Sequence, residues 1–259
     1  MPGSLFHPSN DYVTLADGQR VYASPDRGVS LTVAAPEAFG FLDANVSKIQ
    51  ISGSQLSVAD DKAISLVGSD ITIDAGAKLQ AAGGRVDLIG TASAGEVPLP
   101  QADVIPSLPV KSAVVHIADS QLQADGVGGG RITIAGDQVR IEDSTLSART
   151  SGRQDGRGIA LQAQRELNLT RSLVDTRTSY TGDAGDIQVQ APNITLDMRD
   201  ATGEVGLRSR CRPWRAKRWP IVPGRRQARA YGRSRVRAVG PSDTVKTVCK
   251  AHPTRRQAI

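Results

Sequence analysis

Aromatic side chains are scarce in this sequence of 259 residues, where Phe, Trp and Tyr together make up only 3%. Large globular cores usually draw much of their buried area from such rings. Any core here must therefore be built from Ile, Val, Leu and Ala. Together with 26 glycines, this composition is more typical of a repetitive solenoid than of a large globular enzyme.

Cysteine and tryptophan are absent from most of the chain, since both residue types occur only at Cys211, Trp214, Trp219 and Cys249. The preceding residues therefore need no oxidising compartment in order to fold. The sequence contains no run of about 18 apolar residues and does not open with a basic segment followed by an apolar one. We expect neither a membrane anchor nor an export signal in the chain as written.

The body lacks a net positive charge, because the excess of Lys and Arg is concentrated near the C-terminus. Residues 204–259 hold 16 Lys and Arg against 2 Asp and Glu, which leaves 16 against 24 for residues 1–203. The net charge of +6 and the pI near 9.6 thus describe the tail, and a basic partner-binding surface is not expected on the body.

An internal repeat organises the body. Each copy has two apolar-x-apolar pairs, then a serine or small residue two positions before a lone leucine, then a glycine-rich turn. The copies begin at Ile64, Val86, Ile132, Ile159 and Ile187, at spacings of 22 to 28 residues with one of 46. The long spacing contains a proline-rich insertion, residues 90–113, which reads as a loop.

Apolar pairs with period two predict short strands, and no segment of the body sustains a helical period. Stacked copies would turn each inward row into a continuous column. We therefore predict an all-β fold, a right-handed parallel β-helix, over residues 46–200. A β-sandwich is the alternative, but it has no reason to keep the turns in register. The residues expected to point inward are Ile132, Ile134, Val139, Ile141, Leu146, Ile159, Leu161, Leu167 and Leu169.

Several stretches closely resemble the filamentous haemagglutinin-like exoproteins of two-partner secretion. They are ADGQRVYAS at Ala16, LTVAAPEAFGFL at Leu31, ISLVGSDITI at Ile64, AAGGRVDLIGTASAGEV at Ala81 and GDIQVQAPNITLD at Gly185. The resemblance implies a parallel β-helix shaft, export by an outer-membrane β-barrel transporter, and roles in adhesion, aggregation or biofilm formation. It implies no catalytic residues.

The same resemblance implies a division of the chain. Residues 1–45 would be an irregular leading segment left from the secretion domain, and residues 201–259 a basic tail that is disordered or non-native. The chain would then be a fragment that starts downstream of the family's signal peptide. Its expected location is the outer cell surface or the extracellular space.

Two stacked carboxylates are the strongest candidate for chemistry. Asp119 and Asp143 precede the serines of two DS-x-L turns and should lie in equivalent corners of adjacent repeats. Such a pair could act as general acid and base on a glycan or hold a divalent cation. The simpler interpretation is a solvated ladder of turns, with Arg171 in the next corner compensating the charge.

Two other motifs have structural explanations. His116 lies in an apparent strand and has no second His or Cys at a metal-binding spacing. The glycine-rich segment at Gly126 precedes a strand and not a helix, unlike a phosphate-binding loop. We therefore assign no catalytic, cofactor-binding or metal-binding residues.

The sequence favours a non-enzymatic adhesin-like segment whose ligands are host-cell, glycan or neighbouring-cell surfaces, with residues 90–113 as the expected contact region. One alternative is a β-helix enzyme, a lyase or hydrolase, that acts on polysaccharides. The other is nucleic-acid binding by the arginine-rich tail, although the abrupt change in composition argues for a non-native extension.

Overall fold

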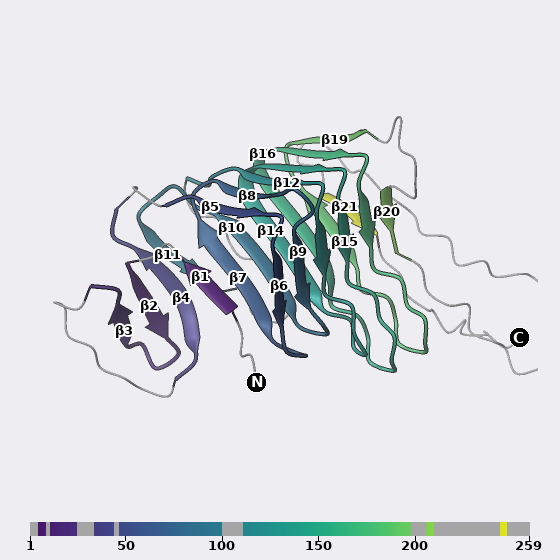
Figure 1. Ribbon diagram of the computed structural model, residues 1–259, viewed down its shortest axis with the longest axis horizontal. Helices are drawn as coiled ribbons and strands as arrows, with labels where there is room; N and C mark the ends of the chain where they lie inside the picture. The colour runs from purple at the N-terminus through teal and green to yellow at the C-terminus, as the bar shows by residue number, and fades with distance from the viewer. Residues whose placement is uncertain are drawn as a thin grey trace, which may run out of the picture.

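The computed structural model describes residues 5–8, 11–24, 34–43, 47–99, 111–197, 206–209 and 244–247. These residues form strands and turns without a helix, so the prediction of an all-β fold is confirmed (Figure 1). It follows that the described residues contain no helix long and apolar enough to cross a membrane.

Most strands fall into three rows, in which neighbouring strands are hydrogen-bonded (Figure 1). Row A consists of β1 (Leu5–Pro8), β7 (Ala63–Gly68), β10 (Arg85–Gly90), the first parts of β14 (Arg131–Glu142) and β16 (Gly158–Thr170), and β18 (Ile187–Gln190). Row B consists of β5 (Ile49–Ser52), β8 (Ile71–Asp74), β12 (Val115–Ala118), the second parts of β14 and β16, and β19 (Asn193–Asp197). Row C consists of β6 (Gln55–Val58), β9 (Lys78–Ala81), β13 (Gln121–Gln123), β15 (Thr145–Ser147), β17 (Leu173–Asp175) and β20 (Gly206–Arg208).

Pairing within the three rows is parallel, and it keeps equivalent positions of the sequence repeat opposite one another. In row A, Ile132 pairs with Val86 on one side and Ile159 on the other. In row C, Leu122 pairs with Leu79 and Leu146. The repeat read from the sequence is therefore the spatial repeat of the sheets.

The main core is aliphatic throughout. Its buried members are Ile, Leu, Val and Ala from all three rows, with no aromatic ring among them. The nine residues predicted to point inward are each at most 1% exposed, which confirms the register: Ile132, Ile134, Val139, Ile141, Leu146, Ile159, Leu161, Leu167 and Leu169. Burial of these side chains supplies the main driving force for stacking.

A second, smaller core lies outside row A. The side sheet consists of β2 (Tyr12–Leu15), β3 (Arg20–Tyr22), β4 (Pro36–Phe41) and β11 (Gly95–Pro98), paired antiparallel in the order β11-β4-β2-β3. Phe39 and Phe41 of β4 are grouped in one apolar cluster with Val67 and Ile89 of row A. Phe39 and Phe41 thus attach the side sheet, while the main core contains no aromatic ring.

Two predicted segments need correction at this point. Residues 1–45 are not wholly irregular, because β1 joins row A and β2 to β4 form most of the side sheet. The supposed loop 90–113 contains β11, while residues 100–110 lie outside the described residues. Strand β11 was not predicted, because its sequence ends in Pro98 and does not alternate between apolar and polar residues. Proline is tolerated there because β11 lies at the edge of its sheet.

The predicted boundary at residue 201 is also wrong for two short segments. Strand β20 extends row C, and its Leu207 packs partly buried against the main core. Strand β21 (Thr244–Thr247) pairs antiparallel with β18. Most of the remaining tail, including both cysteines and both tryptophans, lies outside the described residues.

Candidate functional site

The predicted carboxylate pair lies in a column of corners that follow the strands of row B. Gly53, Ala75, Asp119, Asp143 and Arg171 each adopt a positive φ, between 45° and 57°. Four of these five residues carry a side chain in a left-handed conformation that normally costs about 1 kcal/mol or more. The corner geometry is therefore set by the stacked backbone and not by the residue type.

Serine hydroxyls bind each corner to the next one. Ser144 Oγ donates to the carbonyl of Glu142 at 2.6 Å and accepts the N–H of Ser120 at 3.1 Å. Ser172 Oγ repeats the arrangement, accepting the N–H of Ser144 at 3.0 Å. Because these serines are buried, each hydroxyl satisfies a backbone donor that water cannot reach.

Arg171 compensates Asp143, as the simpler interpretation of the sequence expected. Its Nε donates to Asp143 Oδ1 at 2.7 Å, and its second contact is to Oδ2. This hydrogen bonding lowers the pKa of Asp143, so the carboxyl stays ionised. A carboxylate held in this state by Arg171 is unsuited to act as the proton donor of an acid–base pair.

The other sequence motifs occupy ordinary structural positions. His116 lies in β12 between Thr72 and Arg140 of the neighbouring strands, while the residues on either side of it are fully buried. Gly126 and the glycines after it form the turn between β13 and β14. Within the described part of the chain, no group of three His, Cys, Asp or Glu side chains is arranged to hold a metal ion.

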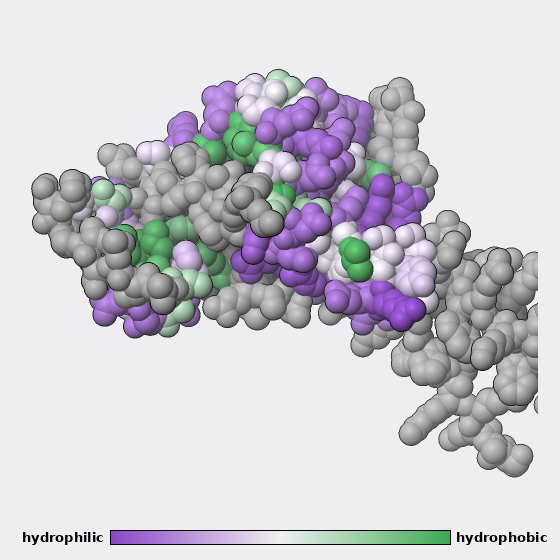
Figure 2. Space-filling model, turned by 60° about the horizontal axis from the view of Figure 1, so that its bottom comes forward, coloured by the Kyte–Doolittle hydropathy of each residue, from purple (hydrophilic) through white to green (hydrophobic). Residues whose placement is uncertain are grey.

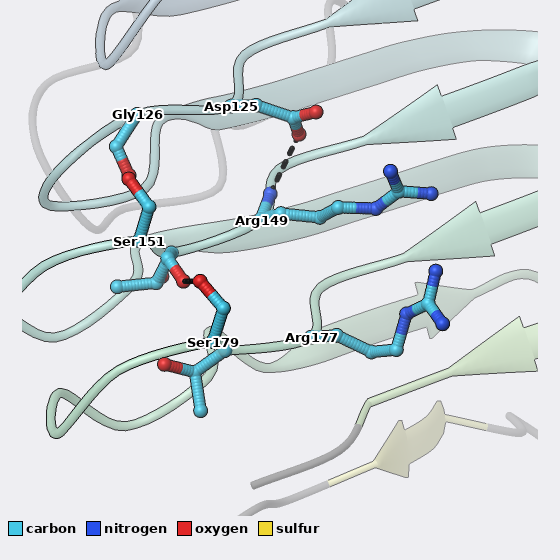
Figure 3. A pocket seen from close by; sticks show the side chains of 8 residues that line it. Asp125, Gly126, Arg149, Ser151, Arg177 and Ser179 are labelled. Carbon is cyan, nitrogen blue, oxygen red and sulfur yellow. Dashed lines mark hydrogen bonds between the residues drawn. The ribbon is translucent and has the colours of Figure 1, made fainter. Parts of the chain in front are cut away.

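A polar hollow lies on the turns that follow row C, and the sequence reading missed it. Gly126, Thr150 and Thr178 of successive turns are bridged in parallel, so three turns lie side by side (Figure 3). They enclose about 420 Å³. The lining residues are Asp125, Gly126, Arg149, Thr150, Ser151, Arg177, Thr178 and Ser179.

Two arginines of the hollow share one buried carboxylate. Asp175, the last residue of β17, has a fully buried side chain and accepts Arg149 Nε at 2.8 Å and Arg177 Nε at 2.9 Å. The two guanidinium groups extend side by side from adjacent turns (Figure 3). The buried carboxylate neutralises only one of the two positive charges.

An acceptor lies beside the arginines, because Asp125 holds the same position in its turn as Arg149 and Arg177 hold in theirs. Asp125 Oδ1 accepts the backbone N–H of Arg149 at 2.8 Å, which fixes its carboxylate against the next turn. Ser151 and Ser179 lie at the other end of the hollow (Figure 3), and their hydroxyls donate to backbone carbonyls at 3.2 and 3.4 Å. The hollow thus presents charged groups at one end and hydroxyl groups at the other.

The sequence does contain a signal for this site. Arg-Thr-Ser occurs at Arg149–Ser151 and again at Arg177–Ser179, 28 residues later, which is one repeat. A polar triplet that recurs at the repeat spacing indicates polar residues stacked on the surface. In the same way, leucines that recur at this spacing indicate residues stacked in the core. The apolar and glycine positions that define the repeat do not include this triplet.

Asp87 is a second group that the sequence reading missed. It is fully buried on row A, where it pairs in register with Ser65 and Thr133. Its Oδ2 accepts the Ser65 hydroxyl at 3.0 Å, while Oδ1 has no hydrogen-bond partner. Burial raises the pKa of Asp87 to about 6, although the charge of Arg85 opposes the shift. A carboxyl without solvent access cannot meet a substrate, so its effect is on stability.

Comparison of the chain with protein-family models, with curated proteins and with solved structures finds no match.

Proposed function

We propose that residues 46–200 form a right-handed parallel β-helix in which one repeat makes one turn. Three observations support this: pairing within the rows is parallel, the register advances by one sequence repeat per strand, and each repeat contributes one segment to every row. The side sheet is then an attachment to the shaft, fixed by its own aromatic cluster.

We further propose that the protein is a non-enzymatic adhesive segment of a surface-exposed or secreted protein, related to the filamentous haemagglutinin-like exoproteins. The observation that carries this proposal is that each repeat separates its buried apolar positions from its polar turn positions. Inward positions are aliphatic and fully buried, whereas polar turn residues recur in columns across repeats. A long face of repeated polar groups suits binding to an extended surface better than turnover of a small substrate.

In this proposal the full-length protein is exported through the outer-membrane transporter of two-partner secretion and presents its shaft to host cells, to glycans or to neighbouring bacteria. The resemblance of residues 12–200 supplies this part. The carboxylates argue in the same direction: Asp143 is held ionised by Arg171, and Asp87 is shut away from solvent.

Microspheres coated with the whole chain provide a test. We expect them to adhere to bacterial or epithelial surfaces and to one another. Spheres coated with an Ile134→Asp variant carry nearly the same surface chemistry on a disrupted core, and they should not adhere.

Three results would contradict the proposal. The first is equal adhesion by both kinds of sphere, and the second is adhesion by neither. The third is turnover of pectin, alginate or another glycan that is abolished by Asp143→Asn, which would establish the polysaccharide-active enzyme instead.

A further inference from the structure

We propose that the hollow formed by Asp125, Gly126, Arg149–Ser151 and Arg177–Ser179 is a binding site for an acidic sugar, a pyranose that carries one carboxylate. This inference deepens the proposed function, on which it rests for the choice of a glycan over another small acid. The ligand class follows from the charges, the hydroxyl groups and the exposed apolar side chains of the three turns.

The two arginines supply the carboxylate subsite. Their side chains remain 42% and 32% exposed, although both contact the buried Asp175. Arg149 uses only its Nε on that carboxylate, and its terminal nitrogens have no hydrogen-bond partner among the described residues. Arg177 binds Asp175 through Nε and Nη2, so its guanidinium is held still more firmly. The terminal nitrogens of Arg149 thus form a rigid fork, the geometry that binds carboxylates through two parallel hydrogen bonds.

The remaining lining suits hydroxyl groups. The hydroxyl groups of Ser151 and Ser179 donate their hydrogen bonds to carbonyl oxygens. Their oxygens therefore remain able to accept hydrogen bonds. Asp125, whose Oδ1 accepts a backbone donor, is a further acceptor. Sugar hydroxyls donate to such acceptors, whereas a fully ionised phosphate or sulfate group cannot.

The charges of the lining favour a ligand with one negative charge over a polyanion. Arg149 and Arg177 are offset by Asp175 and Asp125, so the four groups sum to zero. A polyanion such as nucleic acid or a densely sulfated chain would therefore meet no excess of positive charge and would be repelled by the Asp125 carboxylate beside Arg149. A sugar with one carboxylate places its charge on the exposed arginine nitrogens and its hydroxyls near the serines.

Exposed apolar side chains follow two of the lining residues in the chain. Tyr180 follows Ser179 and is 46% exposed, and Val127 follows Gly126 and is 66% exposed. Figure 2 shows small hydrophobic spots among hydrophilic and neutral residues on the face that carries the turns. Exposed rings and methyl groups beside polar groups provide a surface for the apolar face of a pyranose. A volume of about 420 Å³ lies at the lower end of ordinary ligand sites and suits one or two sugar units.

The test is calorimetric titration of the whole chain with galacturonate and with sialyllactose, which each carry one carboxylate and distinguish a uronate from a sialate. Galactose and lactose are the uncharged counterparts, and a sulfated disaccharide tests for a preference for sulfate. We expect at least one carboxylated sugar to bind about 10-fold or more tightly than its uncharged counterpart, because a charge-assisted pair is lost in the latter.

Variants locate the site. Arg177→Gln should weaken binding about 10-fold or more, and Tyr180→Ala by several-fold. Tyr180→Ala removes an exposed side chain and leaves the buried Asp175 paired with both Arg149 and Arg177. This variant therefore still tests the site if Arg177→Gln does not fold. Arg165→Gln is the matched control, because Arg165 is an exposed arginine paired with Asp137 away from the hollow.

The proposal is overturned if no carboxylated sugar binds at millimolar concentration, if the uncharged or sulfated sugar binds as tightly, or if folded Arg177→Gln and Tyr180→Ala both bind like the unchanged protein. These titrations use free sugars, whereas the microsphere assay measures adhesion. Loss of one with retention of the other therefore shows which of the two proposals fails.

Discussion

Single hydroxyl groups hold the corners of the repeats together, and Ser144 is the clearest case. Its Oγ bonds both the Glu142 carbonyl and the Ser120 N–H. Ser144→Ala should lower the free energy of unfolding by about 1 to 3 kcal/mol, because it leaves a buried donor unsatisfied. Urea unfolding followed by circular dichroism measures the change.

The matched control is Ser54→Ala. Ser54 occupies the same corner position at the exposed start of row C and donates only to the carbonyl of Ser52. The Ser54→Ala variant should lose well under 1 kcal/mol of the free energy of unfolding, because water replaces the lost partner. Equal losses in both variants would show that the stacked hydroxyl has no special role.

Asp87 couples stability to pH. Its pKa is raised by burial from 3.8 to about 6, so the folded state binds a proton more tightly than the unfolded chain. Below about pH 4 the carboxyl is neutral in both states. As the pH rises from about 4 to about 6, the unfolded chain ionises more readily than the folded protein, so the fold is destabilised progressively, and above this range the penalty levels off. The penalty reaches about 3 kcal/mol.

Asp87→Asn removes this titration. The stability of the unchanged protein relative to the variant should fall between pH 4 and pH 7 and level off above that range, as measured by urea unfolding at several pH values. A difference that stays constant with pH would mean that Asp87 does not titrate in the folded protein.

Strand pairing across repeats is the property that defines the elements. Gln121 of β13 and Thr145 of β15 are direct partners in row C. With Cys211 and Cys249 replaced by serine, Gln121→Cys combined with Thr145→Cys should form a disulfide under mild oxidation, because directly paired strand residues lie within disulfide reach.

The control for this cross-link shifts one partner by two residues. Gln123→Cys combined with Thr145→Cys places the Cα atoms about 8 Å apart, which is beyond disulfide reach. Gel mobility without reductant measures both. Cross-linking of the shifted pair in preference to the direct pair would disprove the register.

The elements of rows A, B and C could be read from sequence because their signal is local and repeated. Ile132 and Ile134 recur as Ile159 and Leu161 at a fixed spacing, and burial of one face enforces the register. The side sheet could not be found this way, because β4 and β11 are separated by more than 50 residues and occur once each. Pairing without repetition leaves no periodic trace.

Within the candidate site, likewise, the repeated positions could be predicted from the sequence and the others could not. The ladder at Asp119, Asp143 and Arg171 was predictable, because corner positions follow from the repeat. The hollow at Arg149 and Arg177 depends on Asp175, whose importance arises from its complete burial beneath both arginines. Burial of a polar residue at the end of a strand is a three-dimensional fact that a single sequence does not display.

At the scale of the whole molecule, the repeats should be interchangeable units. Deleting residues 159–186 removes one complete repeat, and it lets Ile187 take the place of Ile159 beside Ile132 because the two share one register. We expect this variant to unfold cooperatively at a lower urea concentration, since each repeat adds its own stacking energy.

Deleting residues 159–172 provides the contrast. It removes half a repeat and brings row C sequence into row A, so the inward pattern is lost and the chain should not fold beyond this point. Circular dichroism and urea unfolding compare the two. A half-repeat deletion as stable as the full one would show that the stack tolerates a break in its period.

The hydrogen bonds of the three rows run along the direction in which the repeats are stacked, and this has a mechanical consequence. A pull on the two ends of the stack would load these bonds one repeat after another, so the chain would yield by peeling and not by a single rupture. Each 28-residue repeat that peels off would release about 100 Å of chain. Under tension such a protein extends in steps and dissipates mechanical work at each step, while the repeats that are still folded remain able to bind their ligand.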